Sequence, residues 1–109
     1  MATPNRGDIL EIRLTIKEKK FQKALVLVLS LAGFNCFGSA LVCPLIVQKR
    51  SERDHGFPVR FETTGEVSGG LVLCHRLRSL RYDAYAARNF GRLADEIVDE
   101  VLARIHILI

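Results

Sequence analysis

An alternating run of apolar and polar residues near the N-terminus most constrains what this chain can fold into. Its four apolar members are Leu10, Ile12, Leu14 and Ile16. A period of two buries one face of a β-strand and leaves the other face polar. The next apolar segment, residues 25–31, has no polar residue before Ser30. We therefore expect a half-buried first strand, followed by a central strand that is covered on both faces.

Three further segments favour short strands. Residues 33–39 contain glycine, asparagine and serine and predict a turn. The apolar segment Ala40 to Val47 predicts a third strand that Pro44 interrupts. Alternation over residues 57–61 predicts a fourth strand, and residues 71–75 predict a buried fifth strand that ends at His75.

The last apolar segment has the 3.6-residue period of an amphipathic helix. Its apolar residues fall on one face: Ile97, Val98, Val101, Leu102, Ile105 and Leu108. Acidic residues occupy its first turns, and Arg104 and His106 lie near its end, which matches the helix dipole. We expect a mainly β fold with α: a barrel-like antiparallel sheet of five to seven strands with a C-terminal amphipathic helix.

Length and composition indicate one globular domain. A chain of 109 residues can bury one core but not two, so we expect residues 1–109 to form a single domain. The longest apolar run is about half the length of a bilayer-spanning helix. The N-terminal residues do not resemble a signal peptide. The three cysteines form no CxxC pair, which suits a reducing compartment. We expect a cytoplasmic protein with its cysteines in the core.

Basic side chains are unevenly distributed along the chain. The net charge is +4, and four acids with one base from Ala94 onward give this end −3, so the rest carries +7. The basic residues form three groups that strands separate: Lys17, Lys19, Lys20 and Lys23; Lys49, Arg50 and Arg53 with His55; and His75, Arg76, Arg78 and Arg81. The second group lies in a polar segment, residues 48–56, that predicts a loop able to carry function.

These groups can converge if the loops lie at one end of the sheet. Convergent lysines and arginines bind phosphates, and a histidine or carboxylate among them can transfer protons near neutral pH. A metal-free ribonuclease or a nucleic-acid-binding protein would have this composition, but solvated loop charges explain it equally well. No P-loop, dinucleotide fingerprint or zinc-ligand spacing occurs in the chain, so we expect no cofactor and no metal.

Six stretches, in order from Asn5 to Ile109, resemble the MazF/PemK toxins of bacterial type II toxin–antitoxin modules. They read "NRGDILEIRL", "LVLVLSLAGFN", "LVCPLI", "HGFPVRF", "GGLVLCHRLRSLRYDAYAAR" and "LADEIVDEVLARIHILI". The resemblance implies a small SH3-like antiparallel β-barrel with a C-terminal helix, acting as a homodimer. It also implies metal-independent cleavage of single-stranded RNA and neutralisation by a cognate antitoxin that occupies the RNA groove.

The resemblance also implies roles for individual residues. Glu18 matches the glutamate of the family's catalytic hairpin, Lys23 stands at its arginine, and Lys17 stands at its histidine. His75 stands at the family's aspartate, and Arg76 follows it in place of a nearby arginine. Arg53 and Phe57 match residues of the family's long loop, whereas Ile46 replaces its threonine.

Two interpretations follow for the function. In the first, the chain is an mRNA interferase whose catalytic residues are Glu18, Lys23, Arg53, His75 and Arg76. Substrate binding would then involve Lys17, Lys19, Lys20, Lys49, Arg50, His55, Phe57 and Arg78. In the second, the active site is degenerate and the chain acts by binding its antitoxin, operator DNA through the antitoxin complex, or a protein target such as DNA gyrase.

Overall fold

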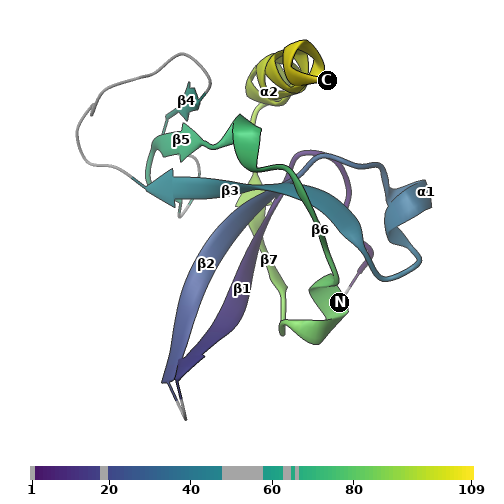
Figure 1. The fold of residues 1–109 in the computed structure, drawn as a ribbon, viewed down its shortest axis with the longest axis vertical. Helices are drawn as coiled ribbons and strands as arrows, with labels where there is room; N and C mark the ends of the chain where they lie inside the picture. The colour runs from purple at the N-terminus through teal and green to yellow at the C-terminus, as the bar shows by residue number, and fades with distance from the viewer. Residues whose placement is uncertain (1, 18–19, 48–57, 63–64, 66) are drawn as a thin grey trace.

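A computed structural model describes residues 2–17, 20–47, 58–62, 65 and 67–109. Its strands are β1 (Asp8–Lys17), β2 (Lys20–Val28), β3 (Ala40–Val47), β4 (Val59–Phe61), β5 (Gly70–Val72), β6 (Arg78–Leu80) and β7 (Arg88–Arg92). Its α-helices are α1 (Ala32–Asn35) and α2 (Asp95–Leu108), and single 3₁₀ turns span Cys74–Arg76 and Tyr82–Ala84. Figure 1 shows these elements as a curled sheet with α2 above it.

The strands form one antiparallel sheet in the order β4-β5-β3-β2-β1-β7, with β6 paired to β3 outside this path. Strand β3 has two partners along the same edge, because residues 40–42 pair with β6 and residues 45–47 pair with β5. The sheet therefore curls around β3 into a half-barrel. This arrangement confirms the expected fold class, a mainly β structure with a C-terminal helix.

The curled sheet buries apolar residues on both faces. The helix-side core joins α2 to one face and contains Ile9, Leu27, Leu29, Cys43, Leu45, Val59, Phe61, Val67, Val72, Cys74, Leu93, Val98, Val101 and Ile105. The second core lies on the other face and contains Leu10, Ile12, Val26, Val28, Ala40, Val42, Leu80 and Tyr82. Strand β2 contributes to both cores, as its continuous apolar run predicted.

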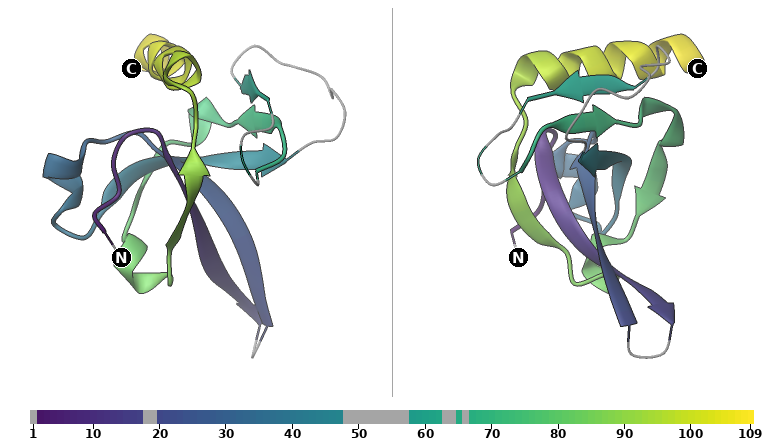
Figure 2. Two further views of the ribbon diagram at one scale, coloured as in Figure 1. Left: turned by 180° about the vertical axis from the view of Figure 1, so that it is seen from behind. Right: turned by 90° about the vertical axis from the view of Figure 1, so that its left-hand side faces the viewer.

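The first hairpin is longer than the sequence pattern indicated. Strand β2 begins at Lys20 rather than at residue 25, and the backbones of Lys17 and Lys20 pair in the ladder. The hairpin projects from the sheet on the side away from α2 (Figure 2).

Pro44 lies inside β3 without interrupting it, which corrects the expected break. It pairs with Val26 of β2, and its carbonyl oxygen accepts a hydrogen bond of 2.9 Å from the Leu73 amide on the opposite side. In an antiparallel strand, the N–H and C=O groups of one residue point toward the same neighbouring strand. The missing N–H of Pro44 therefore faces the gap between β5 and β6, where no ladder bond is lost.

The Arg6-Gly7-Asp8 segment attaches the start of β1 to two neighbouring elements. The Arg6 Nε donates to the Leu29 carbonyl at 2.7 Å, and the Gly7 amide donates to the Val28 carbonyl at 2.8 Å. Asp8 accepts a hydrogen bond of 3.1 Å from Arg92 at the end of β7. Gly7 has φ +96°, and a Cβ there would lie 3.1 Å from the Arg92 guanidinium carbon. Glycine is therefore favoured at this position.

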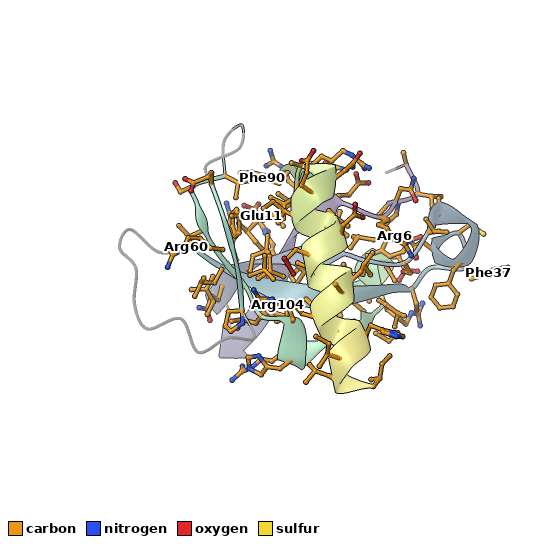
Figure 3. The ribbon with its side chains drawn as sticks, turned by 90° about the horizontal axis from the view of Figure 1, so that it is seen from above. Arg6, Glu11, Phe37, Arg60, Phe90 and Arg104 are labelled. Carbon is orange, nitrogen blue, oxygen red and sulfur yellow. The ribbon has the colours of Figure 1, made fainter. Side chains whose placement is uncertain are left out.

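Helix α2 packs on the helix-side core through the face that the 3.6 period predicted. Val98, Val101 and Ile105 are buried, whereas Leu108 is 42% exposed. Arg104 of α2 donates a hydrogen bond of 3.2 Å to the Pro58 carbonyl, and Figure 3 shows its side chain on the side of the helix that faces β4. No helix in the described part of the chain is long and apolar enough to span a membrane.

Candidate functional site

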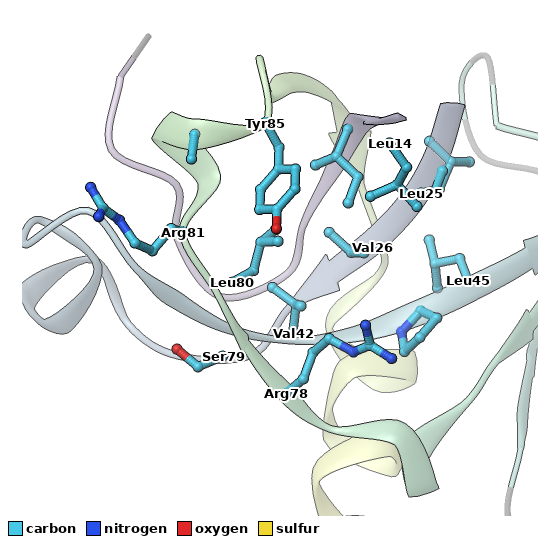
Figure 4. A pocket seen from close by; sticks show the side chains of 14 residues that line it. Leu14, Leu25, Val26, Val42, Leu45, Arg78, Ser79, Leu80, Arg81 and Tyr85 are labelled. Carbon is cyan, nitrogen blue, oxygen red and sulfur yellow. The ribbon is translucent and has the colours of Figure 1, made fainter. Parts of the chain in front are cut away.

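A pocket of about 500 Å³ opens on the face of the sheet that carries the second core. Its lining residues come from β1, β2, β3, β6 and the turn after β6: Ile12, Leu14, Ala24, Leu25, Val26, Val42, Pro44, Leu45, Arg78, Ser79, Leu80, Arg81, Ala84 and Tyr85. The floor is apolar, and the polar groups lie around it (Figure 4). A concave apolar surface with a few polar groups is the usual form of a ligand site.

Arg78 is the cation that the sheet register brings to this pocket. It pairs with Val42 across β3 and β6, so both side chains lie on the same face. Figure 4 shows the Arg78 side chain extending past Val42 toward Leu45. The structure shows no hydrogen bond or ion pair of the Arg78 guanidinium with any described residue. Its charge is therefore available to a ligand.

Tyr85 is a pocket residue that sequence reasoning did not single out. Its ring lines the pocket and the residue is 39% exposed. Its carbonyl oxygen accepts a hydrogen bond of 3.1 Å from the Arg13 amide, which attaches this turn to β1. The following residue, Ala86, has φ +50°, a conformation that non-glycine residues rarely adopt. The available signal was an aromatic residue among small residues in "DAYAA".

His75 and Arg76 lie in the 3₁₀ turn Cys74–Arg76, not at the end of a buried strand. Strand β5 ends at Val72, and the chain then turns at the gap beside Pro44. Both residues are exposed, whereas Cys74 is buried. Strand alternation therefore does not apply to His75 and Arg76, because neighbouring residues in a 3₁₀ turn are about 120° apart.

Lys23 lies on β2 and pairs with Arg13 on β1, and both residues are exposed. The adjacent pair, Ile12 and Ala24, lines the pocket. Because side chains alternate along a strand, the register assigns Lys23 and Arg13 to the face opposite the pocket. Of these two basic residues, Arg78 lines the pocket and Lys23 does not.

Most of the remaining predicted site residues belong to the first hairpin or to the predicted long loop, in segments that the structure does not describe. Glu18, Lys19, Lys49, Arg50, Arg53, His55 and Phe57 lie outside the described residues. The backbones of Lys17 and Lys20 pair with each other where the two strands of the first hairpin meet. Their catalytic and binding roles stay predictions.

Two of the three cysteines belong to the core, as expected. Burial raises the pKa of the Cys43 thiol to about 12 and also raises the pKa of Cys74. Protonated thiols are poor nucleophiles, so these two residues serve packing. Cys36 is exposed, which departs from the expectation. Among the described residues, no three His, Cys, Asp or Glu side chains group as a metal site would require.

The sequence and the fold both match known toxins. Residues 5–109 match the model of a family described as PemK-like, MazF-like toxins of type II toxin–antitoxin systems. The endoribonuclease toxin ChpB of Escherichia coli K12 is 34% identical over 83 residues, which cover 76% of this chain and 72% of ChpB.

Solved structures of the same fold are more distant in sequence. A MazE–MazF structure (Form-II) from Deinococcus radiodurans has a TM-score of 0.84 at 24% identity, covering 99% of this chain and 96% of that one. An endoribonuclease in complex with its cognate antitoxin, from Mycobacterial species, has a TM-score of 0.73 at 14% identity, covering 95% and 92%. These likenesses show the fold. Together with the family match over residues 5–109, they establish that the chain belongs to the PemK-like, MazF-like toxins of type II toxin–antitoxin systems.

Proposed function

We propose that this toxin is an endoribonuclease that cleaves single-stranded RNA without a metal ion. The observation that carries the proposal is the 34% identity to an endoribonuclease toxin, ChpB, over 76% of the chain. The exposed residues His75, Arg76 and Arg78 give it physical support, because they follow one another closely in the chain and Arg78 lines the apolar pocket. Such an arrangement suits a ligand that carries both phosphates and bases.

The chemistry would be an in-line transesterification at one phosphate. The ribose 2′-oxygen forms a bond to phosphorus, the bond from phosphorus to the 5′-oxygen breaks, and a cyclic phosphate and a 5′-hydroxyl result. His75 or Glu18 accepts the 2′-hydroxyl proton, and a protonated group returns a proton to the leaving oxygen. Lys23, Arg53 and Arg76 would stabilise the negative charge that develops on the phosphate oxygens.

The proposal predicts cleavage of a long defined RNA in EDTA between pH 5 and pH 9. We expect His75→Ala to lower the cleavage rate by about 100-fold or more, because removing a general base costs about 10²–10⁴-fold. Glu18→Ala should cost less, about tenfold, if the carboxylate acts electrostatically. Rates from gel-resolved time courses would measure both effects. His106→Ala is the matched control, since His106 is an exposed histidine on α2.

Intact RNA at every pH would reject the enzyme proposal in favour of the binding interpretation. Growth arrest with intact cellular RNA, or inhibition of gyrase supercoiling by the purified protein, would then identify a protein target. A larger loss in Glu18→Ala than in His75→Ala would assign the base to Glu18.

An antitoxin is the proposed protein partner. Structural neighbours of this chain include MazE–MazF structures from Deinococcus radiodurans and a mycobacterial endoribonuclease with its cognate antitoxin. The basic body of the chain, +7 outside the C-terminal segment, would attract an acidic partner segment. Binding to operator DNA would then occur through the antitoxin complex.

A homodimer is the proposed assembly, and an exposed apolar groove provides its surface. The groove, of about 370 Å³, lies between α1, the start of β3 and the end of α2. Its partly exposed apolar members, here called the dimer groove, are Leu31, Phe34, Leu41, Leu77 and Ile109. Ile109 is 91% exposed. Apolar surfaces of this kind on a small protein indicate an interface.

We expect Phe34→Asp with Ile109→Asp to weaken dimerisation by at least about tenfold, because charges would be buried without partners. Sedimentation velocity over a concentration series would measure the dissociation constant. Val47→Asp is the control, because Val47 is an exposed apolar residue at the opposite end of β3 from Leu41. Equal dissociation constants for the double variant and the wild type would reject this groove as the interface.

A further inference from the structure

The pocket beside Arg78 combines an apolar floor with an aromatic ring and a basic side chain. Its floor consists of aliphatic residues, including Ile12, Val26 and Val42, that belong to the second core. A volume of about 500 Å³ lies within the range of small-molecule sites. The floor offers no side-chain donor or acceptor, so its ligand must present a flat or compact apolar surface.

The rim of the pocket holds an aromatic ring on a constrained turn. Tyr85 lines the pocket, and its backbone carbonyl is held by the Arg13 amide of β1 at 3.1 Å. The positive φ of Ala86 follows directly, at +50°. A non-glycine residue in this region requires support from the surrounding structure, and such residues are concentrated at functional sites. The turn presents the Tyr85 ring in a defined orientation.

Arg78 supplies positive charge at the same pocket and makes no hydrogen bond or ion pair with a residue of the described segments. By contrast, Arg81 on the same segment donates to Asp83 at 3.3 Å and extends away from the apolar floor in Figure 4. Surface arginines are readily paired when a carboxylate is in reach, as Arg81 is. The unpaired guanidinium at the pocket therefore points to an anionic ligand whose charge lies next to an apolar group.

We propose that this pocket binds one unstacked nucleobase of the RNA substrate, with the base against Tyr85 and Arg78 on an adjoining phosphate. The inference rests on the proposed ribonuclease function and adds a base-binding subsite that is separate from the proton-transferring residues. A nucleotide combines a base that has a flat face with a phosphate on the same sugar, which matches the apolar floor, the Tyr85 ring and the Arg78 guanidinium. Single-stranded RNA is commonly recognised through bases stacked on aromatic side chains.

The test measures binding of a short single-stranded oligonucleotide with 2′-O-methyl sugars, which cannot be cleaved, in EDTA. We expect Tyr85→Ala to weaken binding roughly tenfold, the effect of losing one stacked base. Tyr85→Phe should bind like the wild type, because it keeps the ring. Arg78→Ala should weaken binding and reduce the salt dependence by about one phosphate contact. Arg88→Ala is the matched arginine control, because Arg88 is an exposed arginine on β7 that does not line the pocket. Circular dichroism melts check that each variant folds.

Abasic substitutions in the oligonucleotide assign the loss to one base. At one position, removal of the base should weaken binding to the wild type roughly tenfold and leave Tyr85→Ala almost unaffected, since the two changes remove the same contact. The subsite proposal would be overturned if each abasic substitution weakened binding to the wild type and to Tyr85→Ala by the same factor. It would also be overturned if the two proteins bound the intact oligonucleotide with equal affinity. Cleavage by the wild type reports separately on the ribonuclease function, so the failure of one proposal is distinguishable from the failure of the other.

Discussion

Replacing Gly70 with alanine is expected to lower the free energy of unfolding by at least about 3 kcal/mol, near the upper end for overpacking a core. Gly70 begins β5 and is buried against β3. An added Cβ would collide with the Ile46 carbonyl oxygen and would lie 2.8 Å from the Ile46 carbonyl carbon and 2.9 Å from the Val47 Cα. All three atoms are backbone atoms, so no side-chain rotation can relieve the contact.

The consequence of this change reaches the candidate site. Strand β5 pairs with β3 through Gly70, Leu71 and Val72 and leads directly into the turn that carries His75 and Arg76. Moving β5 away from β3 would displace that turn, so RNA cleavage should fall together with stability. The functional loss would therefore be structural in origin.

Urea unfolding followed by circular dichroism would measure the effect of the Gly70 substitution. Gly33→Ala is the matched control, because a Cβ there meets no atom within 4 Å. We expect that control to stay within about 0.5 kcal/mol of the wild type, as surface substitutions usually do. Equal stabilities for Gly70→Ala and Gly33→Ala would show that β5 does not approach β3 so closely.

Asn35→Ala is expected to cost about 3 kcal/mol of unfolding free energy. Asn35 is fully buried, and its Nδ2 donates to the Pro4 and Ser30 carbonyls at 2.8 Å each. Its Oδ1 accepts from the Ser30 hydroxyl. Alanine would leave these groups buried without this partner, and each unsatisfied group costs about 1–3 kcal/mol.

Thermal unfolding would detect the Asn35 effect as a decrease in Tm of roughly 12–24 °C, from about 4–8 °C per kcal/mol for a domain of this size. Asn89→Ala is the matched control, since Asn89 is exposed and accepts one hydrogen bond from the Gly91 amide. Its effect should be below about 1 kcal/mol. A Tm for Asn35→Ala within the range of this control would mean that water replaces the lost amide.

The strands and the terminal helix were predictable because their signals are local. Alternation along β1, the continuous apolar run of β2 and the 3.6 period of α2 each reflect which faces of one element are buried. The wrong details all involve non-local partners. The helical turn at α1 depends on Asn35 bonding to Pro4, 31 residues away, and the tolerance of Pro44 depends on the gap between β5 and β6.

The candidate site was predictable only in part. The basic groups were visible in the sequence, and Arg78 proved to line a pocket, but their convergence could not be derived from spacing. The β1–β2 register assigns Lys23 to the face opposite the pocket. Strand β5 ends at Val72, before His75. No sequence pattern indicated Tyr85 as a pocket residue, because its position depends on the hydrogen bond from the Arg13 amide and on the backbone conformation of Ala86.

Patterns within single segments were enough to predict the class of this protein: one small sheet with an amphipathic helix, a basic body, and ordered motifs of the PemK-like and MazF-like toxins. The cations that share a face, and the place where an apolar pocket opens, became known from the folded arrangement. The physical reason is that periodicity records burial element by element. Strand register, the double pairing of β3 and the turn at Tyr85 arise from contacts between residues far apart in the chain.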